Sequence, residues 1–185
     1  MKQNTDDITL SKPIIEMVTV ANEFCYFIDN AEEKSRNGVL EFIHRITPLL
    51  YLKGTLLPDI EPEYPEASER FVTQENWETV FTMLRDKFGK ADEYWIIDPQ
   101  YINETEPLKA SISENLADIY QDMKDFIMLF QKNTHAAREC AIADFKMLFG
   151  NHWGYSIGNI LTRVHYLLQE ESEEPSKATD PMGFD

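Results

Sequence analysis

The sequence feature that most constrains the fold is the helical periodicity of residues 111–168. Its first half begins with Ser111 and has Glu114 three residues later, which is the pattern of a capping box at the start of a helix. Apolar side chains then recur at steps of three and four residues, and this spacing places them on one stripe of a helix. They are Ile112, Leu116, Ile119, Met123, Ile127 and Phe130.

The second half of this stretch carries a glycine at every fourth position: Gly150, Gly154 and Gly158. Each glycine inside a helix costs about 1 kcal/mol relative to alanine. Three of them in one segment therefore indicate that another helix packs close to this backbone, or that the helix is interrupted. We favour close helix–helix packing and keep a kink as the alternative. Whether 137–168 forms one helix or two stays open.

Three further helices are predicted before this stretch. The second of them contains Pro48, which removes one backbone hydrogen bond, so we expect a kink there. The sequence therefore predicts an all-α fold, a single-domain bundle of about six helices. The three additional helices are expected at about 11–29, 38–57 and 73–88.

Two long loops and two loose ends complete the expected organisation. The loop at about 58–72 holds three prolines among acidic residues. The loop at about 89–110 contains a short apolar run, Tyr94–Ile97, that has no evident partner strand and is therefore expected to be an ordered loop. The expected divisions are a flexible N-terminus (1–10), a helical domain (11–169) and an acidic, disordered tail (170–185).

The composition is strongly acidic. With 33 acidic against 17 basic residues, the formal net charge is −16. This balance argues against binding to nucleic acid, because neutralising phosphates requires lysine and arginine. It argues equally against binding to an anionic membrane surface. The charge fits simple solubility, an acidic face for a basic protein partner, or a mimic of nucleic acid.

The cysteine content and the lack of long apolar segments indicate the cellular compartment. Cys25 and Cys140 are too few for a disulfide framework, and both lie in helical patterns, so we expect buried free thiols. No apolar run approaches the ~20 residues that span a bilayer. The first residues lack the apolar core of a secretory signal. These features predict a cytoplasmic protein.

One group of side chains could hold a divalent ion. Asp118 and Asp122 are one turn apart on the helix, and His152 could complete the set if its helix faces theirs. The alternative is that Asp122 or Asp118 forms a hydrogen bond with His152, Trp153 or Tyr120 at a helix contact. At about 100° per residue, Asp118 and Asp125 fall opposite the apolar stripe and are expected to be solvated, whereas Asp122 lies at its edge. His165 is too far along its helix to join His152.

Other catalytic patterns are weak. Glu41-x-x-His44 has the spacing used by di-iron helical bundles, but those proteins need the motif twice and it occurs once here. The sequence has no glycine-rich phosphate loop. We therefore predict no cofactor.

The chain resembles a bacterial all-helical family catalogued as a domain of unknown function. The resemblance covers about 12–169, and it implies a single cytosolic helical domain without an activity, cofactor or catalytic residue to carry over. It rests on the stretches VTVANEFCYFI, TPLLYLKGTLLP, LADIYQDMKDFI, HWG and RVHYLL. It makes one set of side chains the natural candidates for a binding site: Asp118, Tyr120, Asp122, His152, Trp153, Gly154 and His165.

We therefore expect a non-enzymatic module that binds another protein through an acidic surface or through its proline-rich connection. An exposed apolar patch rimmed by carboxylates would support this interpretation. The alternatives are a metal-dependent hydrolase that uses Asp118, Asp122 and His152, and a less favoured nucleic-acid mimic.

Overall fold

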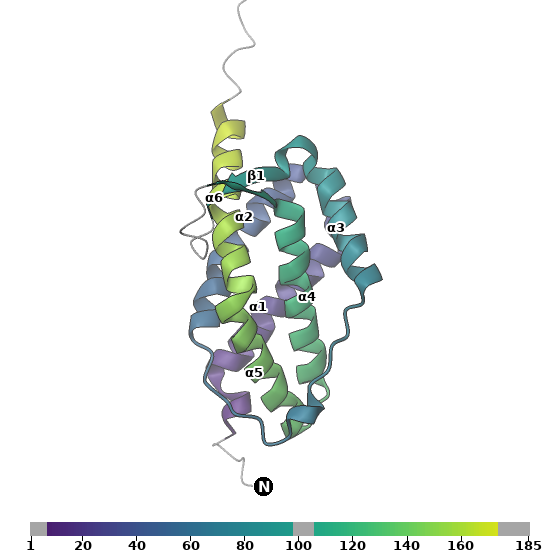
Figure 1. Ribbon diagram of the computed structural model, residues 1–185, viewed down its shortest axis with the longest axis vertical. Coiled ribbons are helices and arrows are strands. Elements are labelled where there is room, and N and C mark those ends of the chain that lie inside the picture. Colours follow the sequence, from purple (N-terminus) through teal and green to yellow (C-terminus); the bar gives the residue numbers. More distant parts are fainter. Residues whose placement is uncertain (1–6, 98–105, 174–185) are drawn as a thin grey trace, which may run out of the picture.

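The structure is a computed structural model that describes residues 7–97 and 106–173. Within this part, the chain forms an all-α bundle with one short hairpin, which confirms the predicted fold class (Figure 1). The helices are α1 (Lys12–Asp29), α2 (Arg36–Thr55), α3 (Gln74–Phe88), α4 (Ile112–Gln131), α5 (His135–Asn151) and α6 (Trp153–Glu173). The strands are β1 (Glu93–Ile96) and β2 (Leu108–Ser111).

Helix α4 is the centre of the bundle. It packs against α1, α3, α5 and α6, while α2 packs against α1 and α6 (Figure 1). Its apolar stripe points into the core, where Phe126 stacks on Phe145 with 4.2 Å between ring centroids. Phe145 in turn stacks on the fully buried Trp153 at 4.8 Å. Aromatic rings from α4, α5 and α6 therefore form one continuous packing unit.

The helix boundaries follow the local sequence signals. The Ser111 hydroxyl accepts the Glu114 N–H at 3.1 Å at the start of α4. Thr73 and Asn76 form a complete capping box at the start of α3. Helix α3 ends at Gly89, whose positive φ of 55° suits a residue without a Cβ. Helix α2 continues through Pro48.

The segment Tyr94–Ile97 differs from the sequence-based expectation of a loop. Glu93–Ile96 is strand β1, and it pairs with the antiparallel strand β2, with Tyr94 opposite Ala110. The partner strand Leu108–Ser111 alternates apolar and polar residues over only four positions, which is too short a run to give a strong sequence signal. The hairpin lies over the start of α4 (Figure 1). Residues 98–105 of the predicted long loop lie outside the described residues.

Ordered structure extends beyond both ends of the predicted helical domain, 11–169. Residues Ile8–Leu10, predicted to be flexible, form a 3₁₀ turn whose Thr9 is buried and accepts a hydrogen bond from Arg138 at 2.9 Å. Helix α6 continues to Glu173, into the segment expected to be disordered. Residues 1–6 and 174–185 lie outside the described residues. Cys25 and Cys140 are buried free thiols, as predicted.

Within the described ranges 7–97 and 106–173, every helix is too short or too polar to cross a lipid bilayer.

Candidate functional site

His152 lies at a break between two helices. Helix α5 ends at Asn151 and α6 begins at Trp153, because the backbone of His152 (φ −140°, ψ −91°) is not helical. Its N–H still donates to the Leu148 carbonyl at 2.8 Å. The segment 137–168 is therefore two helices, and the imidazole projects from the junction between them.

The glycines near this junction do not have the role that we favoured. A Cβ on Gly150 or Gly158 would meet nothing within 4 Å, so the prediction of close packing along one glycine face is wrong. A Cβ on Gly154 would lie 2.3 Å from the Phe149 carbonyl oxygen, so this glycine is required by the helix break itself. The glycine that admits a neighbouring helix is Gly54 of α2, where a Cβ would lie 2.7 Å from the Phe149 ring.

The His152 ring is held between two carboxylates of α4. Its Nδ1 donates to Asp122 Oδ2 at 2.5 Å, and its Nε2 lies 3.8 Å from Asp118 Oδ2. Asp122 is only 2% exposed, whereas the His152 side chain is 40% exposed. The hydrogen bond to Asp122 raises the pKa of His152 above its ordinary value, because the charged imidazolium is the better donor to a carboxylate.

Asp118 has a second partner in α3. Its Oδ1 accepts a hydrogen bond from the Trp77 indole N–H at 2.9 Å. Burial raises the pKa of Asp118, and the Trp77 hydrogen bond opposes this rise because it favours the charged carboxylate. Asp118 thus joins α3, α4 and the α5–α6 junction, and it is half-buried rather than solvated as predicted.

Asp125 is also buried, which corrects the second expectation of a solvated carboxylate. Its Oδ1 accepts the backbone N–H groups of Phe71 and Val72 at 2.7 and 2.8 Å. Arg70 Nη1 lies 3.2 Å from Asp125 and 3.3 Å from Asp122, so one guanidinium bridges the two carboxylates. The connection between α2 and α3, which runs around the end of the bundle opposite the hairpin (Figure 1), covers this side of α4.

This geometry is not that of a metal chelate. Asp122 and Asp118 approach opposite nitrogens of the His152 ring, so the three groups do not converge on one point. Nowhere in the part of the chain that the structure describes do three or more potential ligands gather in a way that could hold an ion. The arrangement matches the alternative expectation of hydrogen bonds at a helix contact.

The remaining sequence candidates lie in three separate places. The Tyr120 hydroxyl donates to Asp29 of α1 at 2.6 Å, and burial raises its pKa. Trp153 is fully buried, and its indole N–H donates to the Phe145 carbonyl at 3.1 Å. His165 of α6 contacts His44 of α2. Among the predicted candidates, the structure therefore brings together only the side chains of Asp118, Asp122 and His152.

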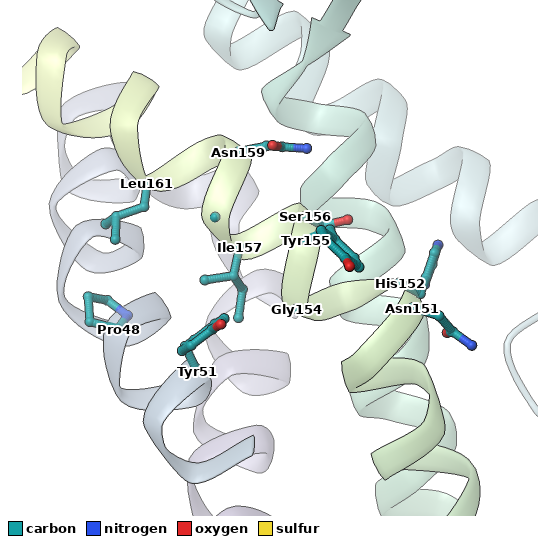
Figure 2. Close-up of a pocket in the computed structure, with 11 residues that line it drawn as sticks. Pro48, Tyr51, Asn151, His152, Gly154, Tyr155, Ser156, Ile157, Asn159 and Leu161 are labelled. Atoms are coloured by element: carbon teal, nitrogen blue, oxygen red, sulfur yellow. The ribbon is translucent and has the colours of Figure 1, made fainter. Parts of the chain in front are cut away.

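A pocket of about 630 Å³ adjoins the exposed side of His152. Figure 2 shows Pro48 and Tyr51 of α2 on the side of the pocket where Ile157 of α6 projects, with His152 on the other side at the α5–α6 junction. The lining is largely uncharged, so it offers little to position an ionic substrate.

A larger groove, of about 1050 Å³, lies between α1 and α3, which both pack on α4. We call this surface the α1/α3 groove. Its apolar lining comes from Ile28, Phe71, Val72, Val80, Met83 and Met128. Five exposed carboxylates also line it: Asp29, Glu32, Glu75, Glu78 and Asp86.

The two lysines of the α1/α3 groove are already engaged. Lys87 Nζ donates to the backbone carbonyls of Glu32 and Lys34 at 3.2 and 2.6 Å. Lys124 Nζ lies 2.9 Å from Asp29 and 5.6 Å from the centre of the Tyr120 ring. Across the described ranges, the structure assigns the Glu32 and Glu75 carboxylates no hydrogen bond or ion pair. Negative charge in the groove is therefore incompletely neutralised.

Residues 8–170 match the family DUF5063, which is described as a domain of unknown function. The chain belongs to this family. Among solved structures, it is similar to the crystal structure of protein BF1032 from Bacteroides fragilis, with 35% sequence identity and a TM-score of 0.76. That similarity covers 87% of this chain and 98% of the other. No curated protein matches the chain.

The polar cluster around His152 consists of Asp118, Asp122, Asp125, Arg70, Trp77 and His152. Sequence reasoning missed two of its members, Arg70 and Trp77, and the whole α1/α3 groove. Arg70 and Trp77 lie on a connection and on a different helix, and no local spacing links them to Asp118 or Asp122. The rim carboxylates of the groove come from separate segments between Asp29 and Asp86. A helical-wheel plot of α3 could have shown an acidic edge beside an apolar one. It could not have shown that α1 lies across the groove from α3.

Proposed function

We propose that this protein is a cytoplasmic, non-enzymatic interaction module that binds a basic, amphipathic segment of a partner protein in the α1/α3 groove. The observation that carries the proposal is the composition of that groove, an apolar floor with five exposed carboxylates around it. The buried free thiols Cys25 and Cys140 support a reducing compartment.

The floor and the rim would contribute differently to recognition. The apolar face of a partner helix would cover Val72, Met83 and Met128, and methionines adapt readily to different side chains. Exposed ion pairs contribute only about 0.2–1 kcal/mol each. Most of the affinity would therefore come from apolar burial, while Glu75 and Glu78 would mainly set orientation and association rate.

The proposal can be tested with two labelled peptides of equal length, one of leucine and lysine and one of leucine and glutamate, both amphipathic as helices. Fluorescence anisotropy should show saturable binding of the basic peptide and none of the acidic one. Glu75→Lys should weaken binding of the basic peptide severalfold, because it replaces an unpaired rim carboxylate with a cation. Met83→Glu should weaken it further, because it places a charge on the apolar floor.

The matched control is Glu23→Lys, which changes the net charge equally on an exposed site of α1 outside the groove. This variant should bind the basic peptide as the wild type does, apart from a small effect of overall charge. If Glu23→Lys and Glu75→Lys lose affinity equally, the attraction is diffuse and the groove is not the binding site.

A further inference from the structure

His44 and His165 form a pair that the polar cluster and the groove do not involve. His44 lies on α2 and His165 on α6, and these helices pack against each other. His44 Nε2 and His165 Nδ1 form a hydrogen bond of 3.2 Å, and the ring centroids are 5.3 Å apart. His165 is exposed and His44 is half-buried, so the facing nitrogens are accessible from solvent.

This spacing suits two nitrogens that share one transition-metal ion. Imidazole nitrogens bind zinc at about 2.0–2.1 Å. Two such bonds that end on nitrogens 3.2 Å apart enclose an angle of roughly 100° at the ion, between the octahedral and tetrahedral values. With each ring pointing at the ion, the centroids would be roughly 5 Å apart, close to the observed 5.3 Å. Binding an ion would replace the hydrogen bond that now joins the two nitrogens.

The surroundings of the pair also favour a cation. The chain carries a formal net charge of −16, which raises the local concentration of divalent cations. Glu41 is not a free third ligand, because its carboxylate bonds Arg45 at 2.9 Å. In the described part of the chain, no third histidine, cysteine or carboxylate completes a ligand set with the pair.

We infer that His44 and His165 form a two-histidine site for a divalent transition metal such as Zn²⁺, Ni²⁺ or Cu²⁺, which would tether α2 to α6. Imidazole suits these ions, whereas Mg²⁺ and Ca²⁺ prefer oxygen ligands. Water or an outside ligand would occupy the other coordination positions, so the site is open in the manner of exchangeable rather than structural zinc sites.

The test is isothermal titration of tag-free protein with ZnCl₂, NiCl₂ and CuCl₂, with MgCl₂ as a negative control. The wild type should bind one ion per chain, and its thermal midpoint should rise with the concentration of bound metal. His44→Ala and His165→Ala should each weaken binding by roughly a hundredfold, because a chelate of two tethered ligands becomes a single-ligand site.

The other two histidines provide matched controls. His135→Ala and His152→Ala should keep the wild-type affinity, and the Cu²⁺ electron paramagnetic resonance spectrum should show two imidazole nitrogens in the wild type and one in His44→Ala. Unchanged binding in both His44→Ala and His165→Ala would overturn the assignment, as would loss of binding in His152→Ala. His165 is exposed on α6, so His165→Ala decides the question even if His44→Ala does not fold.

Discussion

Asp125 fastens the connection between α2 and α3 to the central helix, and its removal should be costly. Its Oδ1 accepts the N–H groups of Phe71 and Val72, and its Oδ2 lies 3.2 Å from Arg70. In Asp125→Ala, two backbone donors lose their acceptor, at about 1–3 kcal/mol each when buried. Solvent reaches these partly buried groups, so we expect the free energy of unfolding to fall by about 2–4 kcal/mol. Asp125→Asn keeps one acceptor oxygen and should lose about 1 kcal/mol.

Equilibrium unfolding in urea, followed by far-ultraviolet circular dichroism, measures this loss. The control is Asp86→Ala, since Asp86 is exposed and, among the residues that the structure describes, its carboxylate pairs only with the chain neighbour Arg85. This control should change the free energy of unfolding by less than about 0.5 kcal/mol. Limited proteolysis of Asp125→Ala should cut within residues 58–72 faster than in the wild type. If Asp125→Ala is as stable as Asp86→Ala, the carboxylate does not hold the connection in place.

Two further predictions concern the helix break. The folded-state pKa of His152 is raised by Asp122, so its contribution to stability is fully present below a pH of about 6.5 and is lost as the pH rises through the raised pKa. Urea titrations across this range should show a decline in the free energy of unfolding that His152→Gln lacks, and equal slopes would contradict the assignment. Gly154→Ala should destabilise the fold, because its Cβ would lie 2.3 Å from the Phe149 carbonyl oxygen, whereas Gly158→Ala should stabilise the helix by about 1 kcal/mol. Thermal melts compare the two, and a Gly154→Ala variant as stable as Gly158→Ala would refute the argument.

Features that depend on near neighbours were predictable from the sequence. Ser111 starts α4 and Gly89 ends α3, and in each case the deciding atoms lie within a few residues. The apolar stripe of α4 was equally local, because helical periodicity alone places Leu116 and Met123 on the buried face. The helices and their buried faces could therefore be predicted from residues close in the sequence.

Features that depend on distant segments were not predictable in the same way. Asp125 looked solvated because the helical wheel shows its distance from the apolar stripe but not the connection that covers it. Strand β2 was missed because its pairing with Trp95 and its neighbours is set by the hairpin rather than by its own composition. The Asp122–His152 hydrogen bond was one of two alternatives, and only the position of the helix break decided between them.

The claim that the α1/α3 groove recognises a basic segment is tested most directly by nuclear magnetic resonance. Adding the unlabelled leucine–lysine peptide to ¹⁵N-labelled protein should shift backbone amides along α3 and the neighbouring part of α4, with the largest changes near Glu75, Met83 and Met128. Glu75→Lys should reduce these changes and Glu23→Lys should not. Shifts that scatter over the acidic surface, or that gather at the hairpin or at His152, would contradict the proposed binding site.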